Sequence, residues 1–160
     1  MQFRVGSRVP DTTSVPASLR PLPAWVATAS RTPQRTWEVT IGSGLSPTWL
    51  INGRTYDPAR SDAFPVLDTT ETWELHNRTA VAHSIHIHAT DWYMLSRNGR
   101  RPKPWEECLK ETFLLNPRDR VVVAGHFSDH TGKFVIHCHM LDHEDHGLMT
   151  QFEVVAPGPA

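Results

Sequence analysis

The chain has few cysteines, little net charge and no long apolar run. Of its 160 residues only two are cysteines, Cys108 and Cys138, so the disulfide framework of a small secreted domain is not expected. Sixteen basic residues against seventeen acidic ones leave a formal net charge of -1. This balance gives no electrostatic reason to expect nucleic acid or an anionic membrane as a partner, and a small or neutral partner fits better.

The longest apolar segments are far shorter than the roughly 18 to 20 residues that a membrane-spanning helix needs. The first residues, MQFRVGSRVPDTTSVP, also lack the apolar region of a secretion signal. We therefore expect a soluble chain without a signal peptide, which leaves its compartment open.

The length predicts one domain with its own core. Residues 1–35 hold five of the thirteen prolines and show little apolar periodicity, which is typical of an extended leader or an interdomain linker. We expect the packed domain to cover residues 36–160.

Short runs with apolar and polar residues in alternation follow one another through this domain, and no segment keeps a helical period over three turns. Turn signals such as Asn98-Gly99 and Asn116-Pro117 separate the runs. The pattern predicts an all-β, antiparallel β-sandwich with one short helical turn around 141–146. The expected strands are 36–41, 48–53, 72–77, 84–89, 92–96, 111–115, 120–127, 133–139 and 149–155.

Seven of the ten histidines lie in two clusters, H-S-I-H-I-H at 83–88 and H-C-H-M-L-D-H-E-D-H at 137–146. Side chains alternate between the two faces of a strand, so His86 and His88 share one face. By the same parity His137 and His139 share a face, and Cys138 points the opposite way. If the two strands are neighbours, four imidazoles converge on one side of the sheet.

Cys138 and His83 then meet on the other side, and His143, five residues after the cysteine, can fold back beside the sulfur. Two imidazoles and one thiolate form a set that favours copper in an electron-transfer role. Zinc is the rival, but structural zinc usually has four firm ligands at spacings that this segment lacks. The four imidazoles of the other face suit copper atoms that meet dioxygen.

The remaining candidates have plainer interpretations. A single histidine in a strand is most often a structural or surface residue, and we expect this for His76, His126 and His130. His146 adjoins the second cluster without matching its spacing, and both interpretations stay open for it. We expect Cys108 to be a free thiol, and the tryptophans, including Trp73 and Trp92, to pack in the core or at its rim.

The segment HSIHIH, followed some fifty residues later by HCHMLDHEDHGLM, resembles the C-terminal cupredoxin domain of multicopper oxidases, the group of laccases and bilirubin oxidases. The segments WLINGRTYDP, TTETWELHNRT and CLKETFLLNPRDRV add to the likeness. The resemblance implies a cupredoxin-like Greek-key β-sandwich that binds copper.

The resemblance also implies a role for each matching residue. Leu148 stands at the family's axial position and cannot coordinate, which implies a three-coordinate type 1 site; Met149 is the alternative, although strand parity directs it elsewhere. Glu144 matches a carboxylate that resembles the proton donor for dioxygen reduction, with a solvent-facing acid at a helix start as the alternative. The implied ligands are His83, Cys138 and His143 for type 1 copper, His86 for type 2 copper, and His88, His137 and His139 for type 3 copper.

The family's type 2 and type 3 cluster takes ligands from two domains, and this chain supplies only half of them. The resemblance therefore implies that a phenolic-type reductant gives electrons at the His143 edge, that Cys138 carries them onward, and that dioxygen is reduced to water with another cupredoxin domain or chain, or a second copy of this one. The lone chain is expected to have little or no oxidase activity. The alternatives are a stand-alone electron carrier and, less favoured, a metal-storage or zinc-binding module.

Overall fold

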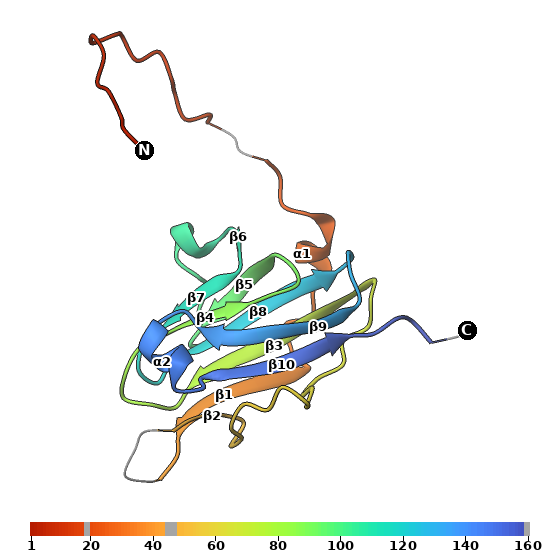
Figure 1. The fold of residues 1–160 in the computed structure, drawn as a ribbon. Helices are drawn as coiled ribbons and strands as arrows, with labels where there is room; N and C mark the ends of the chain where they lie inside the picture. Colours follow the sequence, from red (N-terminus) through yellow and green to blue (C-terminus); the bar gives the residue numbers. More distant parts are fainter. Residues whose placement is uncertain (18–19, 44–47, 159–160) are drawn as a thin grey trace.

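The structure is a computed structural model that describes residues 1–17, 20–43 and 48–158. These residues form two β-sheets that enclose a common core (Figure 1). The six-stranded sheet has the order β2-β1-β3-β8-β5-β6, with the bounds Trp49–Ile51, Arg35–Ile41, Thr69–Asn77, Arg120–Phe127, Trp92–Arg97 and Leu109–Lys110. The four-stranded sheet has the order β10-β9-β4-β7, with the bounds Met149–Val154, Gly132–Cys138, His83–Ile87 and Thr112–Leu115.

The strands form where the sequence alternates. In β4 the odd-numbered residues His83, Ile85 and Ile87 are buried, while the residues between them face outward. β-Branched and aromatic residues favour such half-buried strands because their side chains pack on the pleated surface. The expected all-β sandwich is therefore confirmed, and nine of its strands overlap the predicted ranges.

The core between the sheets is rich in aromatic rings. Trp73 and Trp92 are fully buried with ring centroids 4.5 Å apart, and Trp73 also meets Phe152 edge-on at 5.1 Å. A Cβ atom added to Gly125 would lie 2.7 Å from a ring carbon of Trp92, so the indole fits only because β8 has a glycine there. The prediction that Trp73 and Trp92 pack in the core is confirmed.

One strand pairing departs from the antiparallel expectation. β1 pairs with β3 in parallel, with Trp37 opposite Leu75. Two parallel strands need a long connection, and the chain between β1 and β3 provides one. Within this connection, β2 pairs antiparallel with the other edge of β1.

Three short elements were not predicted: α1 Ala24–Thr28, η1 Pro104–Glu106 and β6. Each is too short to show a period in the sequence. The helix predicted around 141–146 is present as α2 Leu141–Asp145.

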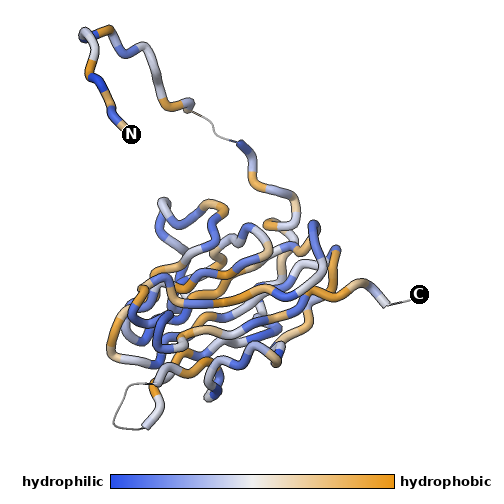
Figure 2. Tube along the Cα trace, in the orientation of Figure 1, coloured by the Kyte–Doolittle hydropathy of each residue, from blue (hydrophilic) through white to orange (hydrophobic). Residues whose placement is uncertain are grey.

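The N-terminal segment runs away from the sandwich and contains both hydrophilic and hydrophobic residues (Figures 1 and 2). Residues 1–17 form no helix or strand. α1 is the first element of the chain that packs against the sandwich. Its Val26 is buried, and the Trp25 ring stacks on His126 of β8 with centroids 6.3 Å apart.

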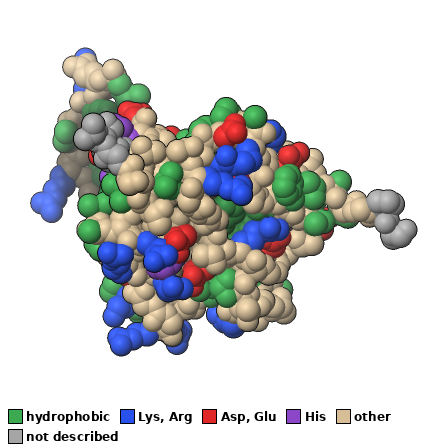
Figure 3. Space-filling view, turned by 90° about the horizontal axis from the view of Figure 1, so that it is seen from below, with side chains coloured by type: hydrophobic (Ala, Val, Ile, Leu, Met, Phe, Trp, Pro, Cys, Tyr) green, Lys and Arg blue, Asp and Glu red, His purple; other side chains and the backbone are tan. Residues whose placement is uncertain are grey.

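No helix among the described residues is long and apolar enough to cross a membrane. Basic and acidic side chains lie close together on the face shown in Figure 3. Ion pairs of the domain include the contacts of Asp62 with Arg54 at 3.0 Å and with Arg60 at 2.8 Å.

Candidate metal centre

The register between β4 and β9 separates the candidate ligands into two groups. Ile85 lies opposite Cys138, and His86 lies opposite His137. Residues that pair directly across strands point to the same face, so the Cys138 side chain enters the core beside Ile85, while His137 faces outward beside His86. We call His83, Cys138 and His143 the inner site, and His86, His88, His137 and His139 the outer site.

The inner site brings three donor atoms into a small triangle. Nδ1 of His83 lies 3.1 Å from Nδ1 of His143, and the Cys138 Sγ atom lies 4.0 Å from the first nitrogen and 3.5 Å from the second. Donors bonded to one ion at about 2.0 to 2.3 Å lie about 3 to 4 Å apart, so these separations suit a single metal ion.

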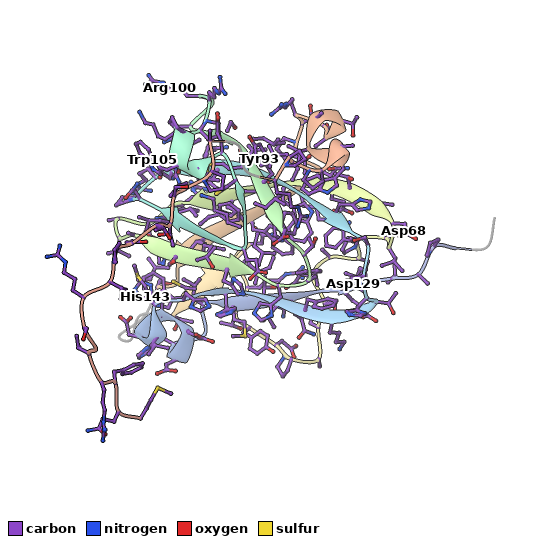
Figure 4. The ribbon with its side chains drawn as sticks, turned by 90° about the horizontal axis from the view of Figure 1, so that it is seen from above. Asp68, Tyr93, Arg100, Trp105, Asp129 and His143 are labelled. Atoms are coloured by element: carbon purple, nitrogen blue, oxygen red, sulfur yellow. The ribbon has the colours of Figure 1, made fainter. Side chains whose placement is uncertain are left out.

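The short helix α2 places His143 in this triangle. The His143 backbone N–H donates to Met140, and the Leu148 N–H donates back to the His143 carbonyl, both at 2.9 Å. Cys138 N–H in turn donates to the Leu148 carbonyl at 3.1 Å. These bonds fold the chain after the cysteine into a loop at one end of the sandwich. Figure 4 shows His143 at this end and Asp129 at the other.

The inner ligands are shielded from water. Cys138 and His83 are fully buried, and the His143 side chain is 12% exposed. Burial and the neighbouring His143 lower the pKa of His83 to about 4, so its imidazole is neutral near pH 7 and can coordinate a metal. Burial raises the pKa of the Cys138 thiol, so a bound cation is needed to favour the thiolate.

The donor chemistry fits copper. One sulfur and two neutral imidazole nitrogens are soft and intermediate ligands, which suit both Cu(I) and Cu(II), and no carboxylate belongs to the group. A fourth firm ligand, as structural zinc requires, is not among the described residues that converge at this point.

Trp49 of β2 closes the inner site from the opposite sheet. Its ring centroid lies 4.9 Å from that of His83, edge-on, and 4.6 Å from that of His143. Trp49 is 8% exposed. Its indole thus packs against both imidazoles, a contact that sequence reasoning missed because β2 lies more than thirty residues before the nearer histidine.

The two residues considered for the axial position occupy different faces. Leu148 is fully buried and belongs to the apolar core that includes Cys138. Met149 lies opposite His137 in the β9–β10 ladder, so its side chain is on the outer face, away from the Cys138 sulfur. The structure thus directs Met149 away from the inner site.

The outer site gathers imidazoles across β4 and β9. His88 and His137 bring their Nε2 atoms to 3.2 Å, and the His86 ring lies 4.5 Å from His88 and 4.9 Å from His139 between centroids. Ligand nitrogens of His86, His88 and His137 lie within 4.8 Å of one another, whereas His139 stands at the exposed edge of the group.

Burial and the neighbouring imidazoles lower the pKa of His86 and of His88, which leaves both rings neutral near pH 7. The His86 Nδ1 atom lies 3.1 Å from the Glu111 carbonyl and 3.0 Å from the Thr112 hydroxyl, so this nitrogen is occupied and Nε2 is left for a ligand. A hollow beside the outer site is lined by His86, His88, Asp91, Glu111 and Asp129, among others.

Glu144 of α2 reaches the outer site. Its Oε1 atom lies 3.3 Å from Nδ1 of His137, a buried nitrogen without a hydrogen-bond partner in the described chain. Burial lowers the pKa of His137, and the Glu144 carboxylate opposes that shift. The side chain of Glu144 is 30% exposed, so it faces both the imidazole and solvent.

The other histidines lie outside both sites. His76 contacts Glu38, His126 bonds the Thr70 hydroxyl at 3.0 Å, and His130 is exposed beside Asp129. His146 bonds the Asp142 carbonyl of its own helix at 2.6 Å. Cys108 is a free, exposed cysteine, as expected.

Comparisons by sequence and by structure lead to one group of proteins. The family model described as multicopper oxidase matches residues 24–158. The bilirubin oxidase of Albifimbria verrucaria is 37% identical over 150 residues, which cover 89% of this chain and 25% of that protein. The laccase of Haloferax volcanii is 32% identical over 165 aligned residues, which cover 98% of this chain and 28% of that protein.

Among solved structures, a multi-copper oxidase from Pediococcus acidilactici matches with a TM-score of 0.78 at 28% identity, covering 92% of this chain and 31% of that one. A multicopper oxidase from Campylobacter jejuni, described as a metallo-oxidase, matches with a TM-score of 0.70 at 26% identity, covering 92% and 34%. These likenesses confirm the cupredoxin-like β-sandwich. The chain spans about a quarter to a third of the length of these proteins.

Proposed function

Because the chain belongs to the multicopper oxidase family, we propose that it is the copper-binding domain of an oxidoreductase that couples oxidation of a small-molecule reductant to reduction of dioxygen to water. The observation that carries this proposal is the buried triangle of His83, Cys138 and His143, with three donor atoms within 4.0 Å. A buried thiol between two neutral imidazoles is a set that copper, in either oxidation state, can occupy.

We assign the inner site to type 1 copper, held by His83, Cys138 and His143. Copper bound there supplies one-electron transfer. Leu148, which is buried in the core that includes Cys138, has no donor atom, so copper would be held by these three residues alone. His143, the more exposed of the two imidazoles, is the edge at which a phenolic-type reductant would approach.

We assign the outer site to one half of a type 2 and type 3 copper cluster, with His86 as the type 2 ligand and His88, His137 and His139 as type 3 ligands. The outer face of the four-stranded sheet presents these rings outward, so a second surface can add the missing ligands. Another cupredoxin domain or chain, or a second copy of this one, would supply them. The chain spans only part of its relatives' length, which is consistent with such a partner.

The backbone joins the two sites. Cys138 is bonded to both His137 and His139, so the sulfur on the core face is only a few covalent bonds from the imidazoles on the outer face. This gives electrons a short path across the sheet from the inner site to the outer one.

Glu144 is proposed to deliver protons for dioxygen reduction. The carboxylate contacts His137 Nδ1 at 3.3 Å while part of it remains in solvent, so it can exchange protons with water next to the outer site.

We further propose that the cupredoxin domain covers residues 36–160, the C-terminal type in this family, with residues 1–35 as an extended leader or interdomain linker that is attached to it through α1. The stand-alone electron carrier is not favoured, because the named relatives are oxidases and the outer site would then have no use.

The test loads the purified chain with Cu(II) and measures copper per chain together with the visible spectrum. We expect the intense charge-transfer absorption of a copper–thiolate bond in the wild type. Cys138→Ser should abolish this absorption because the sulfur is replaced. Cys108→Ser is the matched control. Its spectrum should remain that of the wild type, because Cys108 is exposed and does not belong to the inner site. Copper binding without the absorption, or absorption that survives in Cys138→Ser, would contradict the assignment.

A further inference from the structure

The two ring nitrogens of His83 have different surroundings. Nδ1 faces the other inner ligands, with His143 Nδ1 at 3.1 Å and Cys138 Sγ at 4.0 Å. Nε2 points the other way and lies 2.9 Å from the Thr79 Oγ1 atom. Thr79 is 6% exposed and His83 is fully buried, so water does not compete for this bond. A neutral imidazole carries one proton, and its location decides which nitrogen can bind a metal.

The orientation of the Asn77 amide follows from its neighbours. Its Nδ2 atom lies within 2.8 to 3.3 Å of three backbone carbonyls, which belong to Val81, Leu115 and Asn116. Its Oδ1 atom accepts the Thr79 backbone N–H at 2.9 Å. A flipped amide would place an oxygen against three carbonyl oxygens and an NH₂ group against an N–H donor. Asn77 is fully buried, so no water could relieve that repulsion.

The Thr79 hydroxyl group has one proton and two oxygen acceptors close by. Oγ1 lies 2.8 Å from Asn77 Oδ1 and 3.1 Å from the Val81 carbonyl, and neither oxygen can donate. The proton must therefore go to one of them, because two oxygens at 2.8 Å without a proton between them repel. The two lone pairs of the hydroxyl oxygen are then left to accept hydrogen bonds, and two donors face them: the Val81 backbone N–H at 3.3 Å and His83 Nε2 at 2.9 Å.

We propose that Thr79 is a positioning residue that holds His83 as the Nε2–H tautomer and so leaves the Nδ1 lone pair directed at Cys138 and His143. The chain of bonds from three main-chain carbonyls through Asn77 and Thr79 to His83 fixes both the tautomer and the ring plane before any metal arrives. The proposal rests on the proposed function only in naming that metal as copper. Hydrogen-bond partners on the far nitrogen of a ligand histidine orient the ring and raise its basicity.

A purely structural role for Thr79 makes a different prediction. Its backbone N–H already bonds Asn77, and the turn it belongs to leads into β4, so a substitution could lower stability without changing the imidazole. Thr79→Val keeps the shape and removes the hydroxyl, and Thr79→Ser keeps the hydroxyl. The pair separates the two roles, because only the hydroxyl sets the tautomer.

The first readout needs no metal. Nitrogen-15 NMR of the histidine rings at pH 7 should show His83 as the Nε2–H tautomer in the metal-free wild type and in Thr79→Ser, and a mixture of tautomers in Thr79→Val. An Nδ1–H tautomer in the wild type would overturn the proposal. So would an unchanged Nε2–H tautomer in Thr79→Val. The wild-type spectrum alone tests the tautomer even where a variant fails to fold.

The second readout is metal affinity. Titration with Cu(II) and, separately, with Co(II) should show Thr79→Val binding about 10- to 100-fold more weakly at the inner site, with Thr79→Ser near the wild type. Wild-type affinity in Thr79→Val, or equal losses in both variants, would overturn the positioning role. Absence of a copper–thiolate absorption in the wild type would instead contradict the proposed function, and the tautomer measurement would still stand.

Discussion

The Trp49 ring lies 4.6 Å from the His143 ring, centroid to centroid, although the two residues come from opposite ends of the domain sequence. The same indole meets His83 edge-on. Both imidazoles of the inner site therefore pack against one side chain that supplies no metal ligand.

We expect Trp49→Leu to loosen the inner site. Replacing a buried indole with a smaller side chain leaves a cavity. Truncation of a core tryptophan to alanine lowers the free energy of unfolding by about 3 to 5 kcal/mol, so replacement with leucine should lower it by somewhat less. Urea unfolding of the metal-free chain measures the loss, and copper titration should show weaker binding because both rings gain freedom.

Trp105→Leu is the matched control for that experiment. Trp105 is 74% exposed, so its replacement should change stability by no more than about 0.5 kcal/mol. If the two tryptophan variants behaved alike, packing against the imidazoles would not explain the result.

Leu148→Met should add a thioether next to the inner site. Leucine and methionine have similar volumes, so the change should cost less than about 1.5 kcal/mol. An axial thioether stabilises Cu(II) relative to Cu(I), and we expect a lower reduction potential and an altered charge-transfer spectrum. Redox titration of the copper-loaded chain checks this. An unchanged potential and spectrum would mean that position 148 does not face the metal.

His86→Ala should affect the outer site alone. The affinity for copper beyond the first equivalent should fall by about tenfold or more. Losses of about that size occur even when only a residue that hydrogen-bonds to a metal ligand is replaced. The copper–thiolate absorption of the inner site should persist because His86 lies on the other face of the sheet. Copper content against free copper concentration is the measurement.

His130→Ala is the control for the outer-site experiment, because His130 is exposed and lies in the loop between β8 and β9. It should leave both copper equivalents as in the wild type. Loss of the inner absorption in His86→Ala would show that the two sites are not separated by the sheet as proposed.

Acid should destabilise the fold through two carboxylates around Arg97. Burial raises the pKa of Asp119 and of Glu106, but hydrogen bonds and the Arg97 charge outweigh it, so both pKa values lie below the ordinary 3.8 and 4.5. A lowered folded pKa means that the stabilisation is complete above the ordinary values and is lost as the pH falls below them towards the folded values.

Urea unfolding at pH 7 and at successively lower pH values measures this loss. Asp119→Asn should be less stable than the wild type at pH 7. The difference should shrink as the pH falls below about 4, because Asp119 is then protonated first in the unfolded wild-type chain and, at still lower pH, in the folded protein as well. Asp129→Asn, at a side chain that is 78% exposed, is the control and should track the wild type. A constant difference at every pH would contradict the assignment to Asp119.

Much of the arrangement followed from strand parity. Alternation separates His83 from His86 within one strand and Cys138 from His137 within the other. The observed register then places His86 beside His137, in agreement with the prediction for neighbouring strands. The loop that returns His143 could be expected from its five-residue distance to the cysteine. The roles of these residues as copper ligands remain predictions that the experiments above address.

Other contacts could not be read from the sequence. Trp49 meets the inner site because the two sheets pack face to face, and no spacing along one strand reports what stands on the opposite sheet. Thr79 resembles any polar residue in a turn until the three carbonyls around Asn77 are known. The parallel pairing of β1 with β3 likewise depends on the path of the connection between them.

The opposition of Ile85 and Cys138 has a consequence for how this protein can vary. A slip of one residue between β4 and β9 would turn every side chain of β9 to the other face, putting two imidazoles into the core and the thiol outside. Single-residue insertions or deletions inside these strands should therefore abolish both sites at once, whereas the loop at 128–131 can change length without altering which face each residue occupies. In the ancestry of this domain, length changes are expected only in such loops.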